Sequence, residues 1–225
     1  MISILTTAIN RPTILKKTMD SLLENSNFLE ADVEWIVNID RIEILRNADQ
    51  DFEKTVALAK RYQKFFPVTV LSCYEAKGHA GALLNLMAHQ QGDFIFYLED
   101  DWLCHPELRT QKKLDVFDFL QRMETYSYAT CAMRMEQCSF NPCFIRAHNF
   151  DLVTRDIVST TDAEVQVHRA WMLYKKKDPI NWAFDPLKQS FFSDIGRLWM
   201  KKQPIIKWRR SHRYENRVTY LPKKK

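Results

Sequence analysis

Along the first hundred residues, short continuous apolar runs alternate with segments in which apolar residues recur at helical spacing. Short apolar, β-branched runs of strand length predict strands at residues 2–8, 34–39, 68–73 and 93–98. Between them, apolar residues recur at helical spacing after Pro12 and over residues 51–66 and 80–89. Nearly continuous apolar strands are typical of a sheet covered on both faces. The pattern predicts an α/β fold with a doubly wound, mostly parallel central sheet flanked by helices.

The pattern after residue 104 is less regular. It predicts a helix over residues 106–126, a strand over 128–135, a turn at Asn141-Pro142 and an aromatic helix over 193–202. No Gly-, Ser- or Pro-rich linker divides the chain, so we expect residues 1–225 to form a single domain.

Three consecutive carboxylates follow the fourth apolar run directly. Glu99, Asp100 and Asp101 stand at the end of an expected buried strand, where they repel one another unless a cation neutralises them. Carboxylate oxygens suit a hard divalent ion, so we expect Mn²⁺ or Mg²⁺ here. In a doubly wound sheet the loops after Ala8, Ile39, Cys73 and Leu98 should converge on the same edge.

Composition narrows the class of protein further. The chain has 46% hydrophobic residues and a net charge of +5, and no apolar run approaches the roughly 20 residues that span a bilayer. No signal-peptide pattern opens it, so we expect a cytoplasmic protein, in the host cytoplasm if the source is viral. The positive charge gathers in the C-terminal third. It indicates either a solvated surface or attraction to anions, with at most peripheral membrane association through the basic C-terminus.

Residues 2–12, 78–101 and 194–199 together resemble the family 2 glycosyltransferases and their GT-A relatives, as found in bacterial surface-glycan synthesis and in large DNA viruses. Residues 2–12, ending in Asn10-Arg11-Pro12, resemble the family's opening strand and turn. Residues 78–101 resemble its run from a glycine-alanine helix to the DXD metal motif. Residues 194–199 resemble its late aspartate and the helix that follows.

The resemblance implies a GT-A enzyme that moves a sugar from a nucleoside-diphosphate sugar, with a UDP-sugar favoured, to a hydroxyl of a glycan or glycoprotein. Residues 1–104 would form the nucleotide-sugar-binding half, and residues 105–225 the acceptor-binding half with its basic tail. Family likeness favours inversion at the anomeric carbon, with a carboxylate as the base.

The resemblance also assigns roles to residues of this chain. Asp194 is the expected catalytic base, and Glu164, in a second acidic pair with Asp162, is the alternative. Asp101, Glu99 and His212 are the expected metal ligands. The remaining candidates are donor-binding Thr7, Ala8, Arg11, Asp40, Lys77, His79, Glu99 and Asp100, and acceptor-binding Trp102, Arg197 and Trp199, with Trp171 as a further residue to hold a sugar ring.

Two other functions remain as alternatives. A sugar nucleotidyltransferase has a related sheet, but it needs a glycine-rich phosphate loop, and residues 6–12 contain no glycine. A nucleic-acid-binding protein would use the basic, aromatic-rich C-terminal third, including Trp208, Arg209 and Arg210. The three carboxylates count against nucleic acid as a partner.

Overall fold

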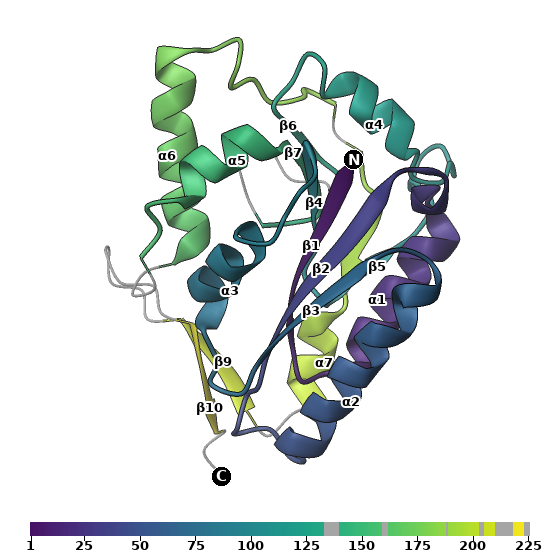
Figure 1. Cartoon of the computed structure of the whole chain (residues 1–225), viewed down its shortest axis with the longest axis vertical. Helices are drawn as coiled ribbons and strands as arrows, with labels where there is room; N and C mark the ends of the chain where they lie inside the picture. The colour runs from purple at the N-terminus through teal and green to yellow at the C-terminus, as the bar shows by residue number, and fades with distance from the viewer. Residues whose placement is uncertain (133–139, 159–161, 188, 203–204, 210–217, 223–225) are drawn as a thin grey trace.

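The computed structural model describes residues 1–132, 140–158, 162–187, 189–202, 205–209 and 218–222. Its centre is a six-stranded sheet in the order β3-β2-β1-β4-β7-β6 (Figure 1). β1 pairs in parallel with β2 and β4, and β2 pairs in parallel with β3. β7 runs antiparallel to β4 and β6. These strands are β1 Ile2–Ile9, β2 Val33–Asp40, β3 Val68–Cys73, β4 Phe94–Tyr97, β6 Tyr128–Thr130 and β7 Cys143–Arg146.

Helices cover both faces of this sheet (Figure 1). One core cluster takes side chains from α1 Pro12–Asn25, α2 Ala48–Arg61 and α4 Val116–Arg122. The other takes side chains from α3 Gly78–Met87, α5 Ala147–Thr154 and α6 Ala163–Lys177. The predicted doubly wound, mostly parallel α/β fold is therefore confirmed. The smaller elements are η1 Phe28–Glu30, η2 Tyr62–Lys64, β5 Trp102–Cys104, β8 Phe192–Asp194, α7 Gly196–Lys202, β9 Ile205–Arg209 and β10 Val218–Pro222.

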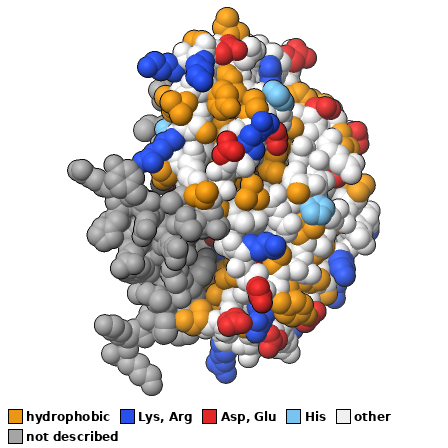
Figure 2. Space-filling view, turned by 60° about the vertical axis from the view of Figure 1, so that its left-hand side comes forward, with side chains coloured by type: hydrophobic (Ala, Val, Ile, Leu, Met, Phe, Trp, Pro, Cys, Tyr) orange, Lys and Arg blue, Asp and Glu red, His pale blue; other side chains and the backbone are white. Residues whose placement is uncertain are grey.

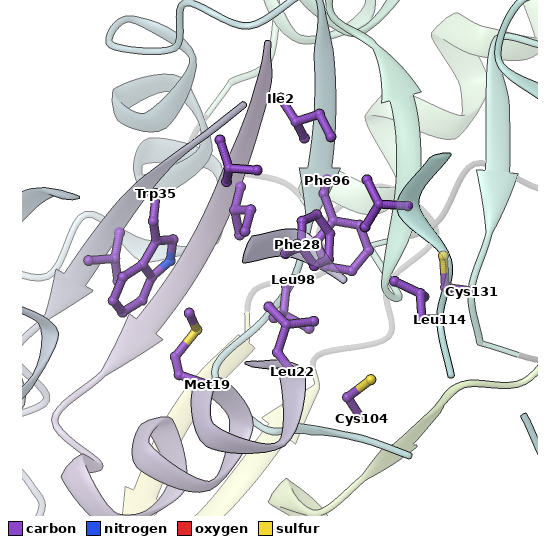
Figure 3. Packing of buried hydrophobic residues seen from close by; sticks show 14 of the residues in the cluster. Ile2, Met19, Leu22, Phe28, Trp35, Phe96, Leu98, Cys104, Leu114 and Cys131 are labelled. Carbon is purple, nitrogen blue, oxygen red and sulfur yellow. The ribbon is translucent and has the colours of Figure 1, made fainter. Parts of the chain in front are cut away.

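The continuous apolar runs reflect burial on both sides of the sheet. Ile4 packs into the cluster under α1 and α2, whereas its neighbour Leu5 packs into the cluster under α3. In the first cluster the rings of Phe28 and Phe96 lie 4.9 Å apart, close to Leu22 of α1 (Figure 3). An alternating pattern, which marks a sheet with one wet face, is absent from these strands for this reason.

The expected helix over residues 106–126 is wrong for its first half. Only α4 is helical there, and Asp115 caps it by accepting from the backbone N–H groups of Phe117 and Asp118. The preceding loop is held by Glu107, whose carboxylate accepts from the N–H groups of Arg109 and Thr110. Local side-chain bonds of this kind compete with helix formation.

The expected helix over residues 193–202 is shorter than predicted. Residues 192–194 form β8, which pairs antiparallel with β5, so that Asp194 lies opposite Trp102. The predicted strand over 128–135 is confirmed at Tyr128–Thr130 as β6 and is wrong at residues 131–132, and residues 133–135 lie outside the described residues. The pairing of β8 with β5 and of β6 with β7 therefore set the ends of these elements, and local periodicity did not.

The surface beside α5 and α6 mixes hydrophobic and charged side chains (Figure 2). Met172 and Leu173 of α6 and the nearby Ile180 are exposed there. None of the helices in the described part of the chain combines the length and hydropathy that a membrane span requires.

Candidate active site

The carboxyl ends of β1, β2 and β4 meet at one edge of the sheet. β1 lies between β2 and β4, so the chain order reverses beside it, and such reversals form ligand-binding crevices in open α/β sheets. Ile9 lies opposite Asp40 on β2, and the N–H of Asp100 donates to the carbonyl of Thr7 at 3.1 Å. The loop that carries Glu99, Asp100 and Asp101 is therefore fixed against the end of β1.

Arg11 neutralises part of the carboxylate motif. Its guanidinium makes two hydrogen bonds to the carboxylate of Asp100, and Nη2 also lies 3.1 Å from Oδ2 of Asp101. Arg11 is only 6% exposed and Asp100 only 2%. Burial raises the pKa of Asp100, while the charge of Arg11 and the N–H of Ile9 act in the opposite direction. At Asp100, the positive charge that we expected from a metal ion is supplied by Arg11.

The other two carboxylates of the motif are more accessible. The side chain of Glu99 is 33% exposed and that of Asp101 is 21% exposed. Across the described part of the chain, no three His, Cys, Asp or Glu side chains gather closely enough to enclose a metal ion. Mg²⁺ usually binds through one or two carboxylates together with substrate phosphates. Glu99 and Asp101 fit such an open site, whereas the buried Asp100 does not.

A hydrogen-bond chain links β1 to the other side of the motif. The hydroxyl of Tyr97 lies 2.7 Å from Oγ1 of Thr7 and 3.0 Å from Nε2 of His79, which in turn lies 3.8 Å from Oε1 of Glu99. Burial raises the pKa of Tyr97 well above its ordinary value, and the charge of Glu99 adds to this. Tyr97 was not among the residues expected from the sequence. It could have been found because it lies within an apolar strand, where a buried tyrosine hydroxyl needs a hydrogen-bond partner.

Asp40 is buried, at 5% exposure, where β2 meets α3. Oδ1 accepts from Nδ2 of Asn38, and Oδ2 accepts from the N–H of Gly78, each at 2.9 Å. Burial raises the pKa of Asp40, and these hydrogen bonds oppose the rise. Gly78 has φ +67, a conformation that favours glycine, and the exposed Lys77 precedes it. Asp40 therefore fixes the start of α3 at the edge of the sheet.

Asp194 lies beside the carboxylate motif because β8 pairs with β5. The N–H of Ile195 donates to the carbonyl of Asp101 at 2.9 Å. Oδ1 of Asp194 accepts from the N–H of Gly196 at 2.9 Å, and Oδ2 lies 2.9 Å from Nε of the exposed Arg197. Asp194 thus caps α7 and shares its charge with Arg197.

The alternative acidic pair lies at the start of α6. Oδ1 of Asp162 accepts from the N–H groups of Glu164 and Val165, so Asp162 is the N-cap of this helix. The charge of Glu164 contributes to the raised pKa of Tyr97. The two candidate bases are therefore held by different elements, β8 and α6.

The aromatic candidates lie in different surroundings. Trp199 is half-buried, with its ring 5.1 Å from Cζ of Arg11, and Nε1 of Trp102 lies 3.4 Å from Oε2 of Glu99. Trp171 is fully buried, and its indole N–H donates to the carbonyl of Trp182 at 3.2 Å. The expectation that Trp171 holds a sugar ring is therefore wrong. Ala8 is buried in the core, and His212 lies outside the described residues.

The fold occurs in other solved structures, one of which is a mannosyltransferase. The S. aureus TarS 1-349 structure matches with a TM-score of 0.58 at 13% sequence identity, covering 84% of this chain and 59% of that one. TarS 1-349 in complex with UDP matches with a TM-score of 0.55 at 11% identity, with the same coverage. The mannosyltransferase PcManGT from Pyrobaculum calidifontis, in complex with GDP-Man and Mn²⁺, gives 0.50 at 12% identity, covering 73% of this chain and 49% of that one.

This chain spans about three fifths of the TarS structure that it matches. No curated protein sequence matches it. The model of the family described as "Glycosyl transferase family 2" matches residues 3–130, which is more than half of the chain and includes the whole carboxylate motif. The chain therefore belongs to glycosyl transferase family 2.

Proposed function

We propose that this chain transfers a sugar from a nucleoside-diphosphate sugar, with a UDP-sugar favoured, to a hydroxyl of a glycan or glycoprotein. One observation carries the proposal. Two accessible carboxylates, Glu99 and Asp101, stand at the point where the sheet order reverses, beside a third that is buried and neutralised. Structures of similar fold that contain UDP, or GDP-Man with Mn²⁺, support a nucleotide-sugar donor.

Glu99 and Asp101 would hold Mn²⁺ or Mg²⁺. When bound, such an ion neutralises the diphosphate as the sugar leaves it. His79 and Tyr97 would orient Glu99, because the hydrogen bonds from Thr7 through Tyr97 lead to His79, whose Nε2 lies 3.8 Å from Oε1 of Glu99. His212 stays a candidate ligand from the sequence alone.

The nucleotide would lie over the ends of β1 and β2. Thr7 and Arg11 come from the end of β1, Asp40 from the end of β2, and Lys77 precedes α3. The exposed ammonium of Lys77 and the start of α3 both favour a phosphate group. Asp40 would accept a hydrogen bond from the base, since each of its oxygens has a further lone pair, while its bonds to Asn38 and Gly78 hold it in place.

Asp194 would act as the base of an inverting transfer. An acceptor hydroxyl is a weak nucleophile until a carboxylate takes its proton, and it must attack opposite the departing diphosphate. The pairing of β8 with β5 keeps Asp194 beside Trp102 at the motif. Trp102 lies opposite Asp194, Arg197 forms an ion pair with it, and Trp199 lies against Arg11; these three residues would contact the acceptor. Glu164 remains the alternative base.

We further propose that residues 1–225 act as a single domain, with donor-binding residues 1–104 and acceptor-binding residues 105–225. β6 and β7 from the second part extend the sheet that the first part begins, which supports this division of labour within one body. A cytoplasmic location remains part of the proposal.

Calorimetry of UDP, GDP and CMP, each with and without Mn²⁺, tests the donor and the metal. We expect Mn²⁺-dependent binding of one nucleoside diphosphate, reduced about a hundredfold by Asp101→Ala because a carboxylate–metal contact is lost. Asp93→Ala is the matched control, since Asp93 lies at the opposite end of β4. If no nucleotide binds under either condition, the transferase proposal fails.

The base is tested with donor hydrolysis, which needs no known acceptor. We expect Asp194→Asn to slow release of the diphosphate from a UDP-sugar about a hundredfold or more, because the general base is lost, while UDP affinity stays the same. Glu164→Gln should leave the rate near that of the wild type. The reverse pattern would transfer the role to Glu164.

A further inference from the structure

The candidate metal site already contains a positive charge of the chain. One guanidinium nitrogen of Arg11, Nη2, contacts both Oδ1 of Asp100 and Oδ2 of Asp101. Nε of Arg11 adds a hydrogen bond of 3.1 Å to Oδ2 of Asp100. An arginine is permanently protonated, so this charge is present at every physiological pH.

Arg11 is also held in place. Its backbone carbonyl accepts from the N–H groups of Ile14 and Leu15 at the start of α1, each at 3.0 Å. The ring of Trp199 lies 5.1 Å from the guanidinium carbon. Arg11 is buried between α1, the carboxylate loop and α7, so its charge stays beside the motif.

The two carboxylates that share Arg11 are not equivalent. Asp100 is buried and accepts from Nε and Nη2 of Arg11 and from the N–H of Ile9. Asp101 is more exposed, and its Oδ2 lies 3.1 Å from Nη2 of Arg11. The Arg11–Asp101 contact is therefore the one that a ligand can exchange most easily.

A divalent cation that uses Asp101 must compete with this guanidinium. The two positive charges repel strongly in a partly buried site, so the cation alone should bind weakly. A nucleoside diphosphate changes the balance, because its phosphate oxygens bind the cation and also offer Arg11 a new acceptor. Metal and nucleotide should then strengthen each other's binding by the same factor.

We propose that Arg11 is a coupling residue, which holds Asp101 while no donor is present and so makes metal binding depend on the diphosphate. This inference rests on the proposed function and adds to it the regulation of the same site. It predicts that the protein discriminates against free divalent ions and binds them together with the donor.

Titrating Mn²⁺ with and without UDP or GDP, and following free Mn²⁺ by electron paramagnetic resonance, tests the coupling without an activity assay. The main variant combines Arg11→Met with Asp100→Asn, which removes the arginine without leaving a buried unpaired carboxylate. We expect Mn²⁺ alone to bind this variant about tenfold more tightly than wild type, and the nucleotide-dependent gain in affinity to fall about tenfold.

A similar arginine elsewhere provides the control. Arg122 bridges Asp118 and Asp185 and lies over the ring of Phe119, with 4.6 Å between its guanidinium carbon and the ring centre. Arg122→Met with Asp185→Asn should leave Mn²⁺ binding unchanged. If the main variant does not fold by circular dichroism, Arg11→Gln with Asp100→Asn replaces it, because this pair keeps polar groups at both positions and still leaves no unpaired buried charge.

The outcomes separate the two proposals. If wild type binds Mn²⁺ with a nucleotide but the folded Arg11 variant shows the same coupling, the role of Arg11 is overturned and the proposed function stands. If wild type binds no Mn²⁺ with either nucleotide, the proposed function fails and this inference fails with it.

Discussion

Gly196 leaves no room for a side chain beside Asp101. A Cβ built on this glycine would lie 2.6 Å from Cγ and 2.9 Å from Cβ of Asp101, and closer still to Oδ2. Atoms at such distances overlap, and the obstacle is the carboxylate at the centre of the candidate site. The absence of a side chain at Gly196 therefore lets α7 begin directly against the motif.

We expect Gly196→Ala to slow diphosphate release from a UDP-sugar about a hundredfold, because the methyl group displaces Asp101 from its position. The rate and the unfolding midpoint would be measured together. Ser193→Ala, on the exposed side of β8, is the control and should change neither. If Gly196→Ala left the rate unchanged, α7 would have to shift without cost, and the position of Asp101 would not depend on α7.

At the scale of the elements, the loop between β2 and α2 is held in place by the side chain of Asn10, in the turn that follows β1. Oδ1 of Asn10 accepts from the N–H of Ile42 at 2.9 Å, and Nδ2 lies 3.3 Å from the carbonyl of Ile42 and 3.2 Å from that of Ala48. Asn10 is buried. It joins two of the loops that form the edge where the nucleotide is proposed to bind.

We expect Asn10→Ala to lower the free energy of unfolding by about 3 kcal/mol, because it leaves buried backbone groups without partners. Urea unfolding followed by fluorescence measures this. Asn25→Ala is the comparison, since its amide also donates to two carbonyls but is only half-buried, and it should cost less. Equal costs for both would show that water satisfies the Asn10 partners.

At the scale of the whole molecule, Trp171 packs α6 against the central sheet. Its ring lies 5.0 Å from that of Trp182 and 5.7 Å from that of Tyr128 on β6. The same core cluster includes Ala80 and Leu83 of α3, the helix that carries His79 at its start. Trp171 therefore stabilises the packing of α6 against β6.

We expect Trp171→Ala to lower the free energy of unfolding by about 4 kcal/mol, because it empties a large buried volume. Trp171→Phe should cost less, since it retains a ring. Nucleotide affinity measured at low temperature should change little in both. No loss of stability in Trp171→Ala would instead contradict a structural role for this residue in the core.

Much of this architecture was predictable from local patterns. Apolar runs at residues 2–8 and 93–98 predicted two strands of the sheet, because burial on both faces demands apolar residues at successive positions. Their parallel arrangement then brought Thr7 and Glu99 to one edge, as expected. The loop at residues 106–115 could not be predicted from the spacing of apolar residues. The Glu107 carboxylate accepts hydrogen bonds from backbone N–H groups there, and these outweigh the helical periodicity of the segment.

By itself the sequence determined the α/β class, the order of strands and helices in the first hundred residues, and the carboxylate motif at the end of β4. Only the tertiary structure decided which carboxylate is neutralised, which is exposed and which element holds each candidate base. Helix and strand periods depend on neighbours along the chain. The contact of Arg11 with Asp100 joins residues 89 positions apart, so it exists only once β1 and β4 have paired.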